Sequence, residues 1–129
     1  MFTIALQFFD ATPEQKIDSA PDEKTTKNKP RAIRCSSCGH VIADTSARIT
    51  VNEQHEHTRR NPAGFEFTFG CFRTAPGARG LGPASSEHTW FAGHTWQLLF
   101  CRACNRHLGW LFRNGNVFFA LILNRLTFE

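Results

Sequence analysis

Two Cys-x-x-Cys pairs constrain the fold of this chain more than any other feature of its sequence. The first pair is Cys35 and Cys38, and the second is Cys101 and Cys104. Two such pairs supply the ligands of a closed tetrahedral site, because each short loop places two sulfurs on one side of an ion. The pattern predicts one structural Zn²⁺ held by all four cysteines.

The two pairs are widely spaced, with 62 residues between Cys38 and Cys101. Several strands must therefore be inserted between the two metal-binding loops. Closing a loop of this length costs roughly 4 kcal/mol plus a constant, and a structural zinc contributes on the order of 10 kcal/mol or more. The alternative is a redox dithiol pair, but two matched pairs favour zinc.

Length and composition indicate one soluble domain. The chain has 129 residues and a formal charge of +4, with Lys and Arg scattered among Asp and Glu, so we expect no nucleic-acid partner. Paired cysteines without a disulfide framework favour a reducing, cytoplasmic location. The apolar Met1–Phe9 lacks a basic flank and is too short to span a membrane, although a weak export signal stays open. We expect a monomer.

The order of the segments predicts an arm followed by a mostly antiparallel β domain. Residues 10–31 are polar and contain several prolines, which predicts a flexible arm over 1–31, so the domain proper covers 32–129. Residues 41–51 suit short strands. Residues 52–60, with His55 and His57, suggest a solvated polar loop more than a metal pair, and 74–83 suggests an irregular loop.

The second half of the domain carries the clearest strand patterns. Alternation over Phe65–Cys71 predicts a half-buried strand. A second strand over 96–100 leads into Cys101, and a third has Leu108, Trp110 and Phe112 on one face. Asn114-Gly115 predicts a hairpin whose return strand covers 117–123.

All three tryptophans of the chain lie in one short stretch, Glu87–Phe112. Trp90 and Trp96 flank a turn, so their indoles can stand on either side of a bend, and Trp110 can form a third wall. Such a cage selects either a cation or a flat neutral ring. Glu87 is the one carboxylate nearby, which gives a cation little support. The alternative is that the indoles are ordinary core residues.

Four ordered motifs resemble the thalidomide-binding (CULT) domain of cereblon. They are Asn61-Pro62-Ala63-Gly64, then Ser86-Glu87-His88-Thr89-Trp90-Phe91-x-Gly93 with Trp96, then Cys101-x-x-Cys104, and then His107-Leu108-Gly109-Trp110-x-Phe112. The resemblance covers residues 32–126 and is closest to the short bacterial single-domain homologues. Ala92 and His94 depart from cereblon itself and are expected to change only the rim.

The resemblance implies a β-tent, in which two antiparallel sheets meet at a steep angle and are pinned by a structural zinc. It also implies a non-enzymatic pocket for cyclic imides such as glutarimide, succinimide or hydantoin rings, either free or formed at a protein carboxy terminus. The three tryptophans would be the walls, and Phe112 the base. The main chain at His88 and Trp90 would bind the imide, flanked by Glu87 and Thr89, with Asn61 and Pro62 over the opening. Phe67 is a possible lining residue, although we expect it in the core.

Two other functions compete with this one. A B-type methionine sulfoxide reductase also carries zinc on two Cys-x-x-Cys pairs, and Cys71 would be its nucleophile. However, Cys71 shares a strand face with three phenylalanines, which favours an inert thiol. Zinc-pinned β folds also bind RNA, but that would need a basic concave face. The chain has no room for cereblon's other regions, so ubiquitin-ligase adaptor function is not expected.

Overall fold

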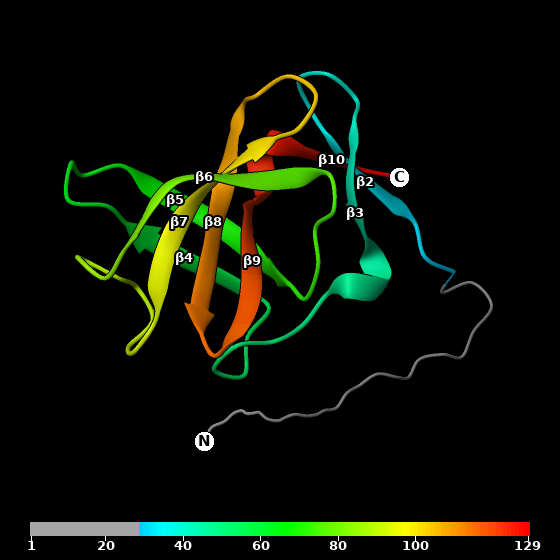
Figure 1. Ribbon diagram of the computed structural model, residues 1–129. Coiled ribbons are helices and arrows are strands. Elements are labelled where there is room, and N and C mark those ends of the chain that lie inside the picture. Colours follow the sequence, from blue (N-terminus) through cyan, green and yellow to red (C-terminus); the bar gives the residue numbers. More distant parts are fainter. Residues whose placement is uncertain (1–28) are drawn as a thin grey trace. The chain divides into compact units, whose positions relative to one another are not determined.

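The computed structural model describes residues 29–129, and within it Arg31–Glu129 forms one compact unit. The two antiparallel sheets of this unit confirm the expected β architecture (Figure 1). The smaller sheet has the order β10 (Leu126–Phe128), β2 (Ala32–Cys35) and β3 (Val41–Asp44). The larger has the order β4 (Glu56–Arg60), β5 (Glu66–Phe72), β9 (Asn116–Ile122), β8 (His107–Asn114), β7 (Thr95–Cys101) and β6 (Ala78–Ser85).

Two single-turn 3₁₀ helices complete the described unit. η3 (Thr45–Ala47) follows β3, and η4 (Leu123–Arg125) joins β9 to β10. The side chain of Asp44 caps η3 by accepting a hydrogen bond from Ser46 N, 2.8 Å away. Within residues 29–129, no helix has the length and hydropathy needed to cross a bilayer.

The larger sheet is apolar on both faces of its central strands. One face packs against the smaller sheet through a cluster that includes Leu111 and Leu121. The other face carries an aromatic cluster that includes Trp110, Phe112 and Phe118. Because successive side chains of a strand point to opposite faces, neighbours such as Trp110 and Leu111 belong to different clusters.

A β-bulge in β8 corrects one of the face assignments. Leu99 pairs with Gly109 but Phe100 pairs with His107, so Leu108 is the extra residue. Leu108 therefore lies in the cluster between the sheets, whereas Trp110 and Phe112 face the other way. Gly109 permits this close approach, because a Cβ there would overlap the carbonyl oxygen of Ala120 on β9.

The other strand predictions from 65 onward are confirmed except at Phe65, which precedes β5 and is 65% exposed, so it does not share the buried face of Phe69 and Cys71. The chain reverses at Gly115, where Asn114 pairs with Asn116. Two expected loops were wrong in part. Residues 56–60 form the edge strand β4, whose polar composition hid a pairing with β5 and a buried His57. The Gly-rich residues 78–85 form the opposite edge strand, β6, with an irregular register against β7. The expected arm lies almost wholly outside the described residues.

Candidate functional site

The four paired cysteines converge on one point between the sheets. Their sulfur atoms all lie within 4.8 Å of one another, with Cys35 and Cys104 3.7 Å apart and Cys38 and Cys101 3.6 Å apart. A regular tetrahedron with metal–sulfur bonds of ~2.3 Å has sulfurs about 3.8 Å apart. The cluster therefore has the donor set and spacing to hold one metal ion.

The two cysteine loops share a main-chain hydrogen-bonding pattern. In each, the first cysteine accepts a main-chain hydrogen bond from the residue four positions on, Gly39 to Cys35 at 2.8 Å and Asn105 to Cys101 at 2.9 Å. Those two donor residues have positive φ angles of 81° and 66°. Gly and Asn tolerate this left-handed conformation best, which is why they stand there.

The electrostatics of the cluster call for a cation. Burial opposes ionisation of Cys101, but the main-chain N–H groups of Cys104 and Ala103, with the adjacent thiols, outweigh it and lower the pKa of Cys101 to about 7. At Cys38 a main-chain hydrogen bond at His40 favours the thiolate, yet burial and the other thiols raise the pKa to about 12. The Cys38 thiol therefore stays protonated near neutral pH unless a cation at the cluster stabilises its thiolate.

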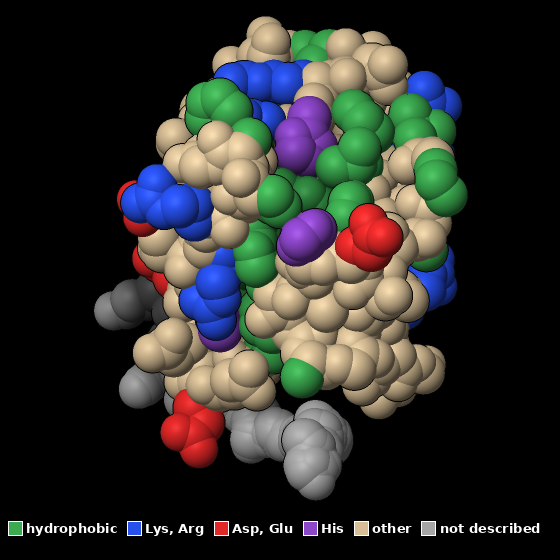
Figure 2. All heavy atoms as spheres, turned by 90° about the vertical axis from the view of Figure 1, so that its left-hand side faces the viewer, with side chains coloured by type: hydrophobic (Ala, Val, Ile, Leu, Met, Phe, Trp, Pro, Cys, Tyr) green, Lys and Arg blue, Asp and Glu red, His purple; other side chains and the backbone are tan. Residues whose placement is uncertain are grey.

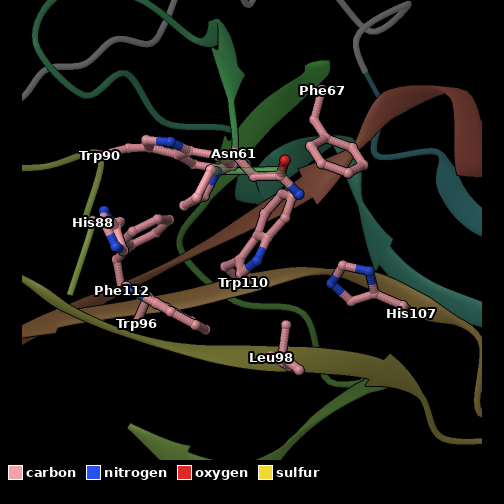
Figure 3. Close-up of a pocket in the computed structure, with 10 residues that line it drawn as sticks. Asn61, Phe67, His88, Trp90, Trp96, Leu98, His107, Trp110 and Phe112 are labelled. Carbon is pink, nitrogen blue, oxygen red and sulfur yellow. The ribbon is translucent and has the colours of Figure 1, made fainter. Parts of the chain in front are cut away.

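The aromatic face of the larger sheet holds a pocket of about 390 Å³. Its walls come from three strands and two loops (Figure 3), and its lining residues are Asn61, Pro62, Phe67, His88, Trp90, Trp96, Leu98, His107, Trp110 and Phe112. Figure 2 shows the side on which the β4–β5 and β6–β7 connections lie, where apolar and histidine side chains gather at the centre.

The three indoles do not collapse onto one another. Trp90 and Trp110 meet edge to face, with ring centroids 4.8 Å apart and an interplanar angle of 76°. Trp96 stands on β7 opposite Phe112 of β8. All three rings line the pocket of about 390 Å³, so its open space lies beside them.

Two of the indoles are fixed by hydrogen bonds to loop main chain. Trp90 Nε1 donates to the Arg60 carbonyl oxygen over 3.2 Å, and Trp96 Nε1 donates to the Glu87 carbonyl oxygen over 2.8 Å. These bonds attach the pocket walls to the ends of the two loops that border the opening. His88, the next residue after Glu87, has a positive φ of 55°, which is unusual for a side chain with a Cβ.

Trp90 is also supported from behind by a stack of rings. Phe69 stacks on it with ring centroids 5.6 Å apart, and His57 in turn stacks on Phe69 with ring centroids 5.7 Å apart. Burial lowers the pKa of His57, while a hydrogen bond between its Nε2 and the Gln54 carbonyl partly opposes the shift. His57 is therefore neutral at physiological pH, and its flat ring supports Phe69 by stacking.

Most of the expected site residues come together. Seven of them line the pocket: Asn61, Pro62, His88, Trp90, Trp96, Trp110 and Phe112. Thr89 lines an open groove of about 420 Å³ that adjoins the pocket and is also bordered by Arg60. Glu87 lines neither space, and its part is the carbonyl oxygen that holds Trp96.

The structure adds three lining residues to the expected set. Phe67, which we had expected in the core, reaches the pocket from β5. Leu98 follows Trp96 by two residues and shares its face, so the alternation of β7 contained the signal. His107 could not be found from spacing, because the bulge at Leu108 changes the period of β8 between it and Trp110.

Cys71 is poorly suited to catalysis. It is fully buried, and burial raises the pKa of its thiol well above the usual range, with a small opposing effect from Arg59. A nucleophilic cysteine needs access and a stabilised thiolate. The geometry therefore does not favour the sulfoxide reductase alternative.

Comparison with known proteins now adds an independent observation. The chain is 29% identical to protein cereblon of Drosophila simulans over 107 residues, which are 76% of this chain and 18% of that protein. It is 29% identical to protein cereblon of Drosophila virilis over 92 residues, 69% of this chain and 14% of that protein. These similarities support a cereblon-like domain.

The similarity extends to a vertebrate cereblon, but there it covers only a short stretch of the chain. Protein cereblon of Gallus gallus is 48% identical over 31 residues, which are 24% of this chain and 7% of that protein. No family model matches the chain. The chain spans less than a fifth of the length of the curated relatives it matches.

Proposed function

We propose that Arg31–Glu129 is a non-enzymatic module that binds cyclic imides, such as glutarimide, succinimide or hydantoin rings and thalidomide analogues. The observation that carries the proposal is the aromatic pocket lined by all three indoles, beside the left-handed main chain of His88. An imide presents an acceptor, donor, acceptor edge to main-chain groups, while its flat ring suits aromatic walls. The ring is either a free small molecule or the cyclised carboxy terminus of a protein.

In this proposal each site residue has a distinct part. Trp90, Trp96 and Trp110 enclose the ring, and Phe112 forms the base. The main chain of His88 and Trp90 bonds the imide edge, with Glu87 and Thr89 beside it and Asn61 with Pro62 over the opening. The left-handed conformation of His88 supports this assignment, because such backbone strain concentrates at binding sites.

The metal and the setting of the protein belong to the same proposal. We assign one Zn²⁺ to the four cysteines, where it would hold the two sheets together without taking part in ligand binding. We further propose a cytoplasmic monomer that works in the manner of the short bacterial cereblon homologues, with neither a nucleic acid nor a membrane as partner. Metal analysis, size-exclusion chromatography and an alignment with bacterial and animal homologues test these points.

Titration of the protein with glutarimide, succinimide and hydantoin, followed by tryptophan fluorescence, tests the proposed function. We expect micromolar binding of at least one ring and its loss in Trp96→Ala. Phe65→Ala is the matched control, since Phe65 is exposed and does not line the pocket. Unchanged affinity in Trp96→Ala would refute the cage, and methionine sulfoxide turnover that depends on Cys71 would favour the enzyme instead.

A further inference from the structure

His57 and His107 each support one of the indole walls of the pocket. His57 stacks on Phe69 with ring centroids 5.7 Å apart, and Phe69 in turn stacks on Trp90. His107 meets Trp110 edge to face, with ring centroids 5.2 Å apart and an interplanar angle of 83°. Figure 3 shows Trp110 between Trp90 and His107, so the two supports act on different sides of the pocket.

His57 is held between a carbonyl group and an arginine. Its Nε2 lies 3.1 Å from the carbonyl oxygen of Gln54, and its Nδ1 lies 3.5 Å from Nη2 of Arg59. A carbonyl oxygen only accepts and a guanidinium only donates, so Nε2 carries the proton and Nδ1 is the acceptor. The charged or titratable groups that face this neutral ring are Arg59 and His55, both near it on β4. The rings that pack against it from β5 and from the loop before β7 do not titrate.

His107 has the same pattern of partners. Its Nε2 lies 3.0 Å from the Gly109 carbonyl oxygen, and its Nδ1 lies 3.3 Å from Nη1 of Arg125. The same Nη1 donates to the His107 carbonyl oxygen over 2.9 Å, and the guanidinium lies over the ring of Phe67. Arg106 adds a second positive charge near Arg125. The rings that pack on His107 from β7 and β8 do not titrate, so this imidazole too is a neutral acceptor beside a cation.

Protonation would turn both contacts from attractive to repulsive. A proton on Nδ1 occupies the lone pair that accepts from arginine, and it leaves two positive charges about 3.5 Å apart in a poorly solvated wall. Relief requires the imidazole or the guanidinium to move away. Burial lowers the pKa of both histidines below the usual 6.5, and the neighbouring arginines lower it further, so the assembled walls favour the neutral rings.

We propose that the two histidine–arginine contacts form a pH-sensitive switch, in which protonation of His57 or His107 releases the indole that it supports and opens the pocket. The closed pocket is favoured above about pH 6.5, and acid favours the open pocket, because histidines released from the wall regain their ordinary affinity for protons. Between pH 7.5 and 5.5 the ratio of open to closed protein rises by up to about tenfold for each histidine. The inference does not depend on which ligand the pocket takes.

Hydrogen exchange of the indole N–H groups measures this opening in the unmodified, zinc-loaded full chain. The three tryptophans give three indole resonances, assigned with single Trp→Phe variants. Trp90 reports on His57, and Trp110 reports on His107. After correction for intrinsic exchange rates, protection of both should fall by about three- to tenfold from pH 7.5 to 5.5. Low concentrations of urea should leave this exchange unchanged, because a local opening exposes little surface.

Glutamine variants separate the two contacts, since an amide donates and accepts as the neutral imidazole does but does not titrate. His57→Gln should remove the pH dependence at Trp90 alone, and His107→Gln should remove it at Trp110 alone. His55→Gln is the matched control. Burial lowers the pKa of His55 as well, but its ring contacts a core phenylalanine instead of a pocket wall. Both indoles should therefore keep their pH dependence in that variant.

Biosynthetic incorporation of 2-fluorohistidine tests the switch without changing the shape of the rings. The fluorinated imidazole stays neutral over this pH range, so indole protection should no longer depend on pH. The same protein controls for the metal, because fluorination leaves the protonation of the cysteine thiols unchanged. A fall in indole protection that persists in the fluorinated protein would overturn the switch.

Two further results would also overturn it. One is equal indole protection at pH 7.5 and 5.5 in the wild type. The other is indole protection that matches the main-chain amide of Leu121, in the core, at every pH, since opening would then be global unfolding. Saturating glutarimide should slow indole exchange at both pH values. If glutarimide has no effect, the proposed function fails, whereas the switch is judged on the ligand-free protein.

Discussion

Phe69 is the residue through which the fold most directly supports the pocket. It is fully buried and stacks with both Trp90 and His57. Its edge contacts reach Trp110 and Phe91, with centroids 5.9 and 6.2 Å away. Phe69→Ala would remove the centre of this ring stack and leave a cavity that its packed neighbours can close only in part.

The expected loss follows from this burial. Phe→Ala at a buried position costs about 3–5 kcal/mol, against a total stability of roughly 5–15 kcal/mol for a domain of this size. With a urea m-value of roughly 1–3 kcal/mol per molar, the unfolding midpoint should fall by about 2 M. Urea titration of zinc-loaded protein, followed by circular dichroism, measures the shift.

The residue just before β5 offers a matched control for this experiment. Phe65→Ala deletes the same side chain from a position that is 65% exposed, and it should change the free energy of unfolding by only about 0.5 kcal/mol. Equal losses at the two positions would refute the argument that Phe69 acts through packing. Phe69→Leu retains volume without a flat face, so it should weaken imide binding more than it lowers stability.

Three further predictions concern the metal, the histidines and the bulge. Removal of metal by a strong chelator should lower the melting temperature of the wild type, with recovery on adding Zn²⁺; Cys101→Ser should abolish stoichiometric zinc by elemental analysis, whereas Cys71→Ser should retain it. Burial lowers the pKa of His55, His57 and His107 below their ordinary 6.5, so the unfolded chain binds more protons than the folded chain. The free energy of unfolding should therefore decline as pH falls below about 6.5. A free energy of unfolding that stays constant between pH 7 and 5 would contradict this. Gly109→Ala should prevent folding because its Cβ meets the main chain of Ala120, whereas Gly115→Asn, with open space around its Cβ, should cost about 1 kcal/mol in a denaturant titration.

The sequence contained enough to predict the four-cysteine cluster and the gathering of the aromatic side chains, because both depend on residue type and local spacing. Paired cysteines need a common centre whatever lies between them, and alternation placed Trp96 and Phe112 correctly. The edge strands were harder, since β4 is polar and β6 is rich in glycine, and only pairing with a neighbour makes them strands. His107 was missed because one extra residue in β8 reverses the side to which earlier residues point.

Strand β8 serves two unrelated purposes on alternate residues. Trp110 and Phe112 face the ligand pocket, whereas Leu111 faces the smaller sheet. Under the proposed function, substitution on one side of the strand would vary ring selectivity and leave the packing between the sheets, on the other side, unchanged. For protein engineering, the pocket face of β8 can therefore be redesigned while the residues that pack the two sheets together are kept.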